Sequence, residues 1–325
     1  MKTGSPSRRS RRGSALLTVL WISAALAAVS FSLATTVRGE TERVSTDLDG
    51  LRAYYLAAGA VERAMIETFW GNWHPEARKI PAGPGWFDYS FPTGVARVEM
   101  IPETAKLDVN SIHPDRLSRM LAAMEVEPAR AEAIKSAIMG HRMAGGPTSF
   151  SAGPTFPGTT ASFQEIEDLL AVPGVTPEIF YGTYAPAEEP VVEGQPRLIR
   201  RSGLADCLSV FGSRDRVEAN TAVPAVLAAV GVPPEGIKVL VAARNAGRIN
   251  MAKLGGLMPS LGPGAAFLQV EGKSIYTIRA TATVRLGNGQ LSEVRRTVAA
   301  KVKYMPEGFA PYIAVLRWYD TAWRN

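Results

Sequence analysis

The feature that most constrains the fold of this chain is an uncharged run near its N-terminus. Residues Ser14 to Val37 read SALLTVLWISAALAAVSFSLATTV, 24 residues without a charged side chain. An α-helix of that length, at about 1.5 Å per residue, crosses a hydrocarbon layer of about 30 Å. Residues 1–13 carry five basic side chains and no acidic one, an excess that is typical of cytoplasmic flanks. We therefore predict one membrane-spanning helix over 14–37, with the N-terminus in the cytoplasm and the bulk of the chain on the far side.

An ordinary secretory signal is the alternative reading of this run. Small residues at Ala25-Leu26-Ala27 would let a signal peptidase cut before Ala28. The uncharged run is longer than the usual apolar core of such a signal, however, and the helical pattern continues past Arg38. Apolar residues recur there mostly at spacings of three, four or seven, at Val44, Leu48, Leu51, Tyr55, Ala58, Met65 and Phe69. The pattern favours one helix from Ser14 to about Trp70, half in lipid and half amphipathic.

Charge and cysteine content exclude several classes of protein. The formal net charge is +6, but residues 1–13 account for +5 of it, which leaves 31 basic and 30 acidic residues in the rest. Because the excess is confined to an N-terminal arm, the charge gives no argument for nucleic-acid binding. Cys207 is the one cysteine, so an intramolecular disulfide and a cysteine-rich metal site are excluded. With 46% hydrophobic residues over 325 positions, the chain can bury a sizeable core.

Two hairpins are predicted, one on each side of a segment without a strand pattern. Alternating apolar and polar residues around Pro92-Thr93-Gly94 and around Gly287-Asn288-Gly289 are typical of paired strands. The expected strands are 86–91, 95–100, 276–286 and 294–304, and the tail 312–318 is a candidate edge strand. Two such hairpins can cover the apolar face of the long helix with an antiparallel sheet. No strand pattern is found between Lys106 and Gly255, so we interpret that segment as an insert.

The insert contains a degenerate repeat. Residues 107–117 (LDVNSIHPDRL) match residues 217–227 (VEANTAVPAVL) with Asn, Pro and Leu in register at an offset of 110. In each copy an Asn-Ser or Asn-Thr turn precedes a proline at a helix start. A Gly/Pro/Ser-rich linker at 140–160 and the segment SFQEIEDLLAVPGV at 162–175 separate the copies.

Together these features resemble those of a known family. A basic leader that ends in Gly13, directly before a small residue and an apolar helix, resembles the class III signal of type IV prepilins and pseudopilins. In that family a prepilin peptidase cuts after the glycine, which implies a mature, N-methylated start at Ser14. The family usually has a glutamate at the fifth mature position, where this chain has Thr18. Loss of that glutamate is typical of the K-type minor pseudopilin of type II secretion systems, whose paired SAM-like repeats the insert also resembles.

The resemblance implies a fold, a function and partners. It implies an α+β, pilin-like fold: a long N-terminal transmembrane and amphipathic helix packed on an antiparallel sheet, with a large helical insert between sheet strands. The expected domains are 1–13 (leader), 14–37 (transmembrane helix), 38–106 (amphipathic helix and first strands), 107–255 (insert with two SAM-like repeats) and 256–325 (last strands). The implied function is that of a minor pseudopilin at the pseudopilus tip in the bacterial inner membrane, supporting pseudopilus initiation and protein export.

The expected partners are the prepilin peptidase, the pseudopilus and the I- and J-type minor pseudopilins. Helices of the partners are expected to pack on the apolar stripe Val44, Leu48, Leu51, Tyr55 and Ala58. The alternative is a minor pilin of a type IV pilus for DNA uptake or adhesion, which differs in partner rather than in fold.

Other readings of the same residues find less support. The repeats resemble helix-hairpin-helix modules, but neither hairpin turn has the Gly-x-Gly that directs N–H groups at a phosphate, so no nucleic-acid partner is expected. The acids Glu165, Glu167 and Asp168 are compatible with a structural calcium ion, although a solvated helix face is favoured and no ligands are assigned. His74, His113 and His141 each sit where a local structural role explains them, and no catalytic motif is found. We therefore do not expect an enzyme.

Overall fold

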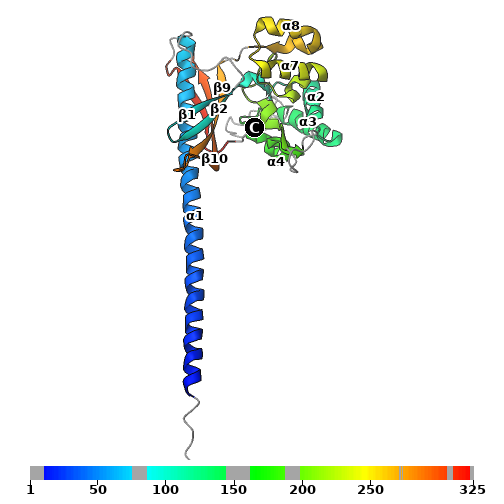
Figure 1. Cartoon of the computed structure of the whole chain (residues 1–325). Helices are drawn as coiled ribbons and strands as arrows, with labels where there is room; N and C mark the ends of the chain where they lie inside the picture. Colours follow the sequence, from blue (N-terminus) through cyan, green and yellow to red (C-terminus); the bar gives the residue numbers. More distant parts are fainter. Residues whose placement is uncertain are drawn as a thin grey trace, which may run out of the picture.

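The computed structural model describes residues 11–74, 86–143, 162–186, 198–270, 272, 274–305 and 310–322. The leader up to residue 10, and residues 144–160 of the linker expected at 140–160, lie outside the described residues, whereas residues 140–143 of that expected linker belong to a helix. A single helix, α1 (Arg11–Trp73), contains 63 residues, so the prediction of one continuous helix is confirmed. Figure 1 shows the N-terminal half of α1 standing clear of the rest of the chain, while its C-terminal part lies against a sheet.

Five antiparallel strands form that sheet. They are β1 (Trp86–Phe91), β2 (Gly94–Pro102), β9 (Ile275–Arg285), β10 (Leu291–Tyr304) and β11 (Ile313–Tyr319). Their order in space is β1-β2-β9-β10-β11, so β2 pairs with β9 although the whole insert separates them in sequence. Each predicted strand, including the edge strand near the C-terminus, is confirmed to within three residues.

Helix α1 packs on the sheet through small side chains. Its buried face consists of Ala53, Ala57, Ala60, Val61 and Ala64. The sheet presents a similar set to it, namely Ala96, Val98, Ala280, Ala282, Val298 and Ala300. Because alanine has no side-chain atom beyond Cβ, helix and sheet approach closely along this face, while Leu48, Leu51 and Tyr55 of α1 stay exposed. At the far end of the chain, Tyr54 Oη donates to Asp320 Oδ1 at 2.6 Å and ties α1 to the residue after β11.

The chain leaves the sheet after β2 and forms the helical insert before it returns at β9. The helices of the insert are α2 (Pro114–Ala123), α3 (Pro128–Met143), α4 (Pro177–Tyr181), α5 (Leu204–Cys207), α6 (Pro224–Ala229), α7 (Pro234–Ala246) and α8 (Met251–Leu261). Short 3-10 turns lie at η2 (Glu103–Ala105), η3 (Ile166–Ala171) and η4 (Gly262–Phe267). Figure 1 shows the insert beside the sheet, on the side away from α1.

Two expectations about the insert are corrected by the structure. It does contain strands: β3 (Leu107–Asp108) runs parallel to β6 (Leu208–Ser209), β7 (Val217–Glu218) runs parallel to β8 (Leu268–Gln269), and β4 (Thr183–Pro186) is antiparallel to β5 (Leu198–Arg201). Strands of two residues are too short to leave an alternating pattern. The expected boundary after Gly255 lies inside α8, and the buried Leu261 and Val270 belong to the core of the insert. The insert therefore extends to about residue 270.

The sequence repeat corresponds to a repeated pattern of hydrogen bonds. Asn110 Oδ1 accepts from the backbone N–H of Phe163 at 2.8 Å, and Asn110 Nδ2 donates to the Phe163 carbonyl at 3.0 Å. Asn220 makes the same pair of bonds to the backbone of Ile249, at 2.8 and 3.1 Å. In both copies the asparagine side chain bonds the N–H and the carbonyl of one distant residue, as a paired β-strand would. The backbone polar groups of Phe163 and Ile249 are thereby satisfied.

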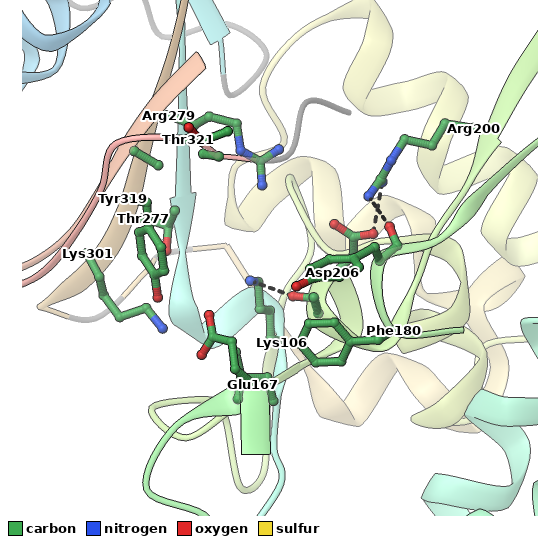
Figure 2. Close-up of a pocket in the computed structure, with 15 residues that line it drawn as sticks. Lys106, Glu167, Phe180, Arg200, Asp206, Thr277, Arg279, Lys301, Tyr319 and Thr321 are labelled. Atoms are coloured by element: carbon green, nitrogen blue, oxygen red, sulfur yellow. Dashed lines mark hydrogen bonds and ion pairs between the residues drawn. The ribbon is translucent and has the colours of Figure 1, made fainter. Parts of the chain in front are cut away.

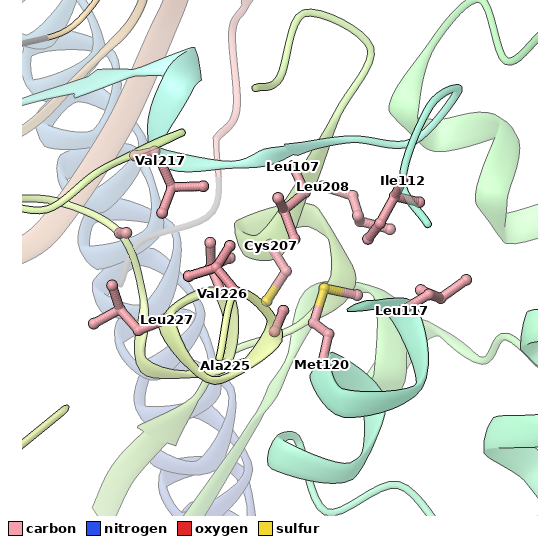
Figure 3. Close-up of a cluster of buried hydrophobic side chains, with 14 of the residues drawn as sticks. Leu107, Ile112, Leu117, Met120, Cys207, Leu208, Val217, Ala225, Val226 and Leu227 are labelled. Atoms are coloured by element: carbon pink, nitrogen blue, oxygen red, sulfur yellow. The ribbon is translucent and has the colours of Figure 1, made fainter. Parts of the chain in front are cut away.

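The helices that follow the two asparagines pack against each other in the centre of the insert. Helices α2 and α6 are in contact, and Met120, Val226 and the buried Cys207 lie close together between them (Figure 3). Helix α6 is about one turn shorter than α2. Equivalent residues of the two copies therefore differ by 110 in number up to the start of these helices and by 106 after their ends. At both helix ends the same backbone bond forms, from Val126 N to Leu121 O and from Val232 N to Leu227 O, each at 3.1 Å.

Candidate functional site: the exposed face of the long helix

The N-terminal half of α1 is apolar and exposed. Among the described residues, α1 is the one helix long and apolar enough to cross a membrane. Its most apolar 18 residues have a mean hydropathy of 2.1, and none of them is buried. Gly13 and Ser14, the predicted cleavage positions, lie in the first turn of this helix. Thr18 is exposed, and its Oγ1 donates to the carbonyl of Ala15 at 3.1 Å. A hydroxyl bonded within its own helix carries no charge, so this position adds no carboxylate to the apolar segment.

The predicted partner stripe continues this exposed surface toward the sheet. Val44, Leu48, Leu51 and Tyr55 are 64%, 44%, 53% and 66% exposed, respectively. They recur at spacings of four, three and four, which places them on one face of the helix. A contiguous apolar surface of this kind on a folded protein marks a site for another protein or for lipid. We call these four residues the stripe.

Further along α1 the observed exposed face differs from the predicted stripe at Ala58, and from the predicted helical pattern at Met65 and Phe69. Ala58 and Phe69 are half-buried and Met65 is buried, because these side chains turn into the core between α1 and the sheet. Two apolar side chains that the prediction missed, Ile66 and Trp70, are 64% and 53% exposed. They lie 11 and 15 residues after Tyr55, a spacing that continues the face of the stripe at 3.6 residues per turn. The same helical spacing in the sequence would have predicted Ile66 and Trp70 as exposed apolar residues.

The sheet and the insert meet at a buried ionic cluster, which we call the junction cluster (Glu103, Lys106, Ser209, Thr277 and Lys301). Glu103 is fully buried; it accepts hydrogen bonds from Ser209 of the insert and, at 2.5 Å, from Thr277 of the sheet. Lys301 Nζ lies 3.4 Å from the same carboxylate. Lys106 Nζ donates to the carbonyl of Ala205 at 2.9 Å. Glu103 is therefore bonded to both units and helps to fix how the insert sits on the sheet.

The junction cluster perturbs the ionisation of its members. Burial raises the pKa of Glu103, but the nearby Lys106 and Lys301 and the two hydroxyl donors lower it, and the net pKa is about 2. Burial lowers the pKa of Lys106, against the attraction of Glu103. Beside the cluster, burial raises the pKa of Tyr319 to about 12, so its phenol stays protonated at neutral pH.

A pocket of about 200 Å³ lies at this junction. Figure 2 shows Lys106, Glu167 and Lys301 pointing toward one another across it, so that cations and a carboxylate share one space. On the side of the insert, Arg200 Nη1 lies 2.8 Å from Asp206 Oδ2. Arg200 and Lys301 are thus each paired with an acid of the protein around this pocket, an arrangement suited to holding two units together.

The acids that were considered for calcium have partners within the protein. Glu165 is ion-paired with Arg317 of β11, which lowers the pKa of the carboxyl group. Asp168 Oδ2 accepts from the backbone N–H groups of Gln164 and Glu165, each at 2.9 Å, at the start of η3. Among the described residues, no group of three or more His, Cys, Asp or Glu side chains is placed to hold a metal ion.

The turns that resemble helix-hairpin-helix modules have local partners as well. In the first copy, Glu127 accepts from the backbone N–H groups of Ala129 and Arg130 at 3.0 and 2.8 Å, and Glu125 is ion-paired with Arg201. A carboxylate already occupies the N–H groups that a phosphate would need. In the second copy, Pro233 removes one such donor.

The predicted local roles of the histidines are confirmed where they are described. His113 Nδ1 accepts from Asp115 N at 3.3 Å and caps α2, while the ring centroids of His74 and His141 lie 4.3 Å from those of Trp70 and Phe163, respectively. Burial raises the pKa of the Cys207 thiol, so that group stays protonated at neutral pH.

No protein-family model matches this chain, and no curated protein matches it. Among solved structures it is similar to a chain of the GspK-GspI-GspJ complex from the type 2 secretion system of enterotoxigenic Escherichia coli. The identity is 14%, the match covers 89% of this chain and 99% of that chain, and the TM-score is 0.41. The chain itself has an α+β fold in which a long N-terminal helix packs on an antiparallel sheet, with a helical insert between two strands of that sheet.

Proposed function

We propose that this chain is a K-type minor pseudopilin of a type II secretion system. In this proposal a prepilin peptidase cuts between Gly13 and Ser14, Ser14 is methylated, and residues 14–37 cross the inner membrane once with the rest of the chain in the periplasm. The protein acts as a structural subunit of the pseudopilus rather than as an enzyme, and it supports pseudopilus initiation and protein export.

The observation that carries this proposal is the uncovered apolar face of α1. The apolar segment in the N-terminal half of the helix and the stripe above it are both exposed, and no described part of the chain lies over them. Lipid can cover the first of these surfaces. The stripe lies beyond the predicted span, where helices of the I- and J-type minor pseudopilins are the proposed cover.

Two features support a place at the tip of the pseudopilus. The insert adds a second body with its own core beside the sheet, a bulk that would collide with a subunit stacked above. Thr18 places no carboxylate in the membrane segment, so this subunit has no group there to neutralise the amino terminus of a neighbour ahead of it. The first subunit of a filament has no such neighbour. The two asparagine-led repeats of the insert are, in this proposal, its SAM-like units.

Charge substitution in the stripe tests the proposed interface. The double variant Leu48→Glu, Leu51→Glu places two carboxylates on the face that partner helices cover, and each buried leucine contributes about 1.5–3 kcal/mol. We expect at least a tenfold loss of the I- and J-type pseudopilins that co-purify with the tagged, full-length chain from detergent-solubilised membranes. The matched control is Val239→Glu, which changes an exposed apolar side chain on α7. Equal recovery with all three proteins would contradict the proposal.

A further inference from the structure

The end of the sheet nearest the membrane segment holds an open groove beside α1. The groove has a volume of about 690 Å³ and is lined by α1, by the β1–β2 turn and by the end of β9 with its following turn. The lining residues are Arg52, Tyr55, Leu56, Pro92, Thr93, Val284, Arg285, Leu286 and Gly287. We propose that this groove binds an acidic side chain on the helix of a neighbouring membrane-anchored subunit. The inference rests on the proposed function and identifies the kind of partner segment that it needs.

The groove continues the stripe. Tyr55 belongs to both, and Arg52 precedes it by three residues, so both side chains lie on the face that carries Leu48 and Leu51. A helix packed along the stripe therefore reaches the groove within two turns. The opposite face of α1 is closed at this level, because Ala53 and Ala57 are buried against the sheet.

The height of the groove excludes lipid as its occupant. Arg52 lies 15 residues beyond Val37, the last residue of the uncharged run. At about 1.5 Å per residue this places Arg52 about 22 Å beyond the end of the span, whereas the headgroup region extends only about 5–8 Å beyond the hydrocarbon on each side. A protein segment at this height, anchored in the same membrane, runs parallel to α1.

The charge of the groove points to a carboxylate on that segment. Among the described residues that line it, two are arginines and none is acidic. Arg285 is exposed and donates from Nη1 to the carbonyl of Gly289 at 3.1 Å, and Arg52 lies 3.8 Å from Asp49 within its own helix. A guanidinium has five N–H donors, so these contacts leave both arginines able to bind a carboxylate. The groove also offers Tyr55 and Leu56 as an apolar wall for the stem of that side chain.

Photocrosslinking in cells tests this placement. Full-length chains carrying p-benzoylphenylalanine at position 48 or position 55 are produced with the I- and J-type minor pseudopilins, and the adducts are mapped by mass spectrometry. We expect both positions to crosslink to the helix of one partner subunit, with the adduct from position 55 within one turn of an aspartate or glutamate. An adduct at 48 without one at 55 overturns the groove but leaves the proposed function standing. Absence of both overturns both. An adduct with a second copy of this chain, or with lipid, overturns the assigned occupant.

Charge reversal tests whether the two arginines bind the partner segment or merely lie near it. In the Arg52→Glu, Arg285→Glu variant the adduct from position 55 is expected to fall at least fivefold, while that from position 48 persists. Changing the mapped partner acid to arginine should restore at least half of the lost yield. The matched control is Arg295→Glu, since Arg295 is exposed on β10 and lies an odd number of residues from the buried Val298, hence on the face away from α1. An unchanged yield in the double variant, or an equal fall in the control, overturns the proposal.

Discussion

Replacing Glu103 by glutamine is expected to lower the free energy of unfolding by about 3–5 kcal/mol, the usual cost of removing one partner from a buried ion pair. The glutamine keeps the shape of the side chain but leaves Lys301 without its buried counter-ion, and removes the negative charge that most favours the charged form of Lys106. Because Glu103 joins the insert to the sheet through Ser209 and Thr277, the loss should affect both units. Urea unfolding of the detergent-solubilised full chain, followed by tryptophan fluorescence, measures it.

The same carboxylate should make stability depend on pH. Its pKa is about 2 in the folded protein against an ordinary value of 4.5, so the folded state holds the charged form more strongly than the unfolded state does. Its stabilisation is fully present above pH 4.5 and is lost as the pH falls through 2. The gap corresponds to about 3 kcal/mol.

Glu103→Gln should therefore remove much of the slope of unfolding free energy against pH between about 5 and 2. Glu125→Gln is the control, because its ion pair with Arg201 is exposed and such pairs are worth about 0–1 kcal/mol. Equal slopes for wild type and Glu103→Gln would contradict the account of the junction cluster.

Replacing Gly182 by valine is expected to cost more than 4 kcal/mol and to unfold the part of the insert around α4 and α5. The backbone at Gly182 has φ +86°, and a Cβ placed there would lie 2.2 Å from the carbonyl oxygen of Arg201. A Cβ on the facing Gly203 would lie 2.3 Å from the Gly182 nitrogen, so two backbones touch with no room for a side chain. Backbone atoms cannot yield as the tip of a flexible side chain can.

Limited proteolysis and chemical unfolding of the full chain measure this loss. The matched control is Gly255→Ala in the middle of α8, where a Cβ meets no atom within 4 Å. Alanine should stabilise that helix by about 0.5–1 kcal/mol. If Gly182→Val unfolds at the same denaturant concentration as wild type, the result contradicts the close contact of the two backbones at Gly182 and Gly203.

Much of the fold could be predicted because its main elements are long and regular. The period of two in β9 and β10, and the uncharged run followed by helical spacing in α1, are local patterns that a single sequence displays. The repeat could be found because Asn110 and Asn220 keep their turn and their proline in register. Both asparagines bond backbone that lies 53 and 29 residues away, and nothing in the sequence identifies Phe163 or Ile249 as those partners.

The rest depended on contacts that local patterns do not record. Glu103 lies in a short polar stretch that looks solvated, and its burial follows from Ser209, Thr277 and Lys301, which are 106 to 198 residues away. The absence of a strand pattern between Lys106 and Gly255 sets the expected boundary of the insert, but α8 runs through Gly255, and Leu261 and Val270 pack in the core of the insert. Along α1, the face rich in alanine is the one buried against the sheet. Hydrophobicity alone would have predicted burial of the face with the larger apolar side chains. Helical spacing predicts Ala58 on the stripe, but Ala58 is half-buried because it packs against the core between α1 and the sheet.

The mature N-terminus of the protein in its native membrane distinguishes a retained membrane anchor from a cleaved signal. As a pseudopilin, the chain keeps the whole apolar segment of α1, stays anchored and presents the stripe to neighbouring helices. Mass spectrometry of the membrane-extracted protein should find a first residue at Ser14, carrying an N-methyl group, and should find unprocessed precursor when Gly13 is replaced by leucine. A first residue near Ala28 would show that an ordinary signal peptidase removes most of the anchor, and would contradict the account.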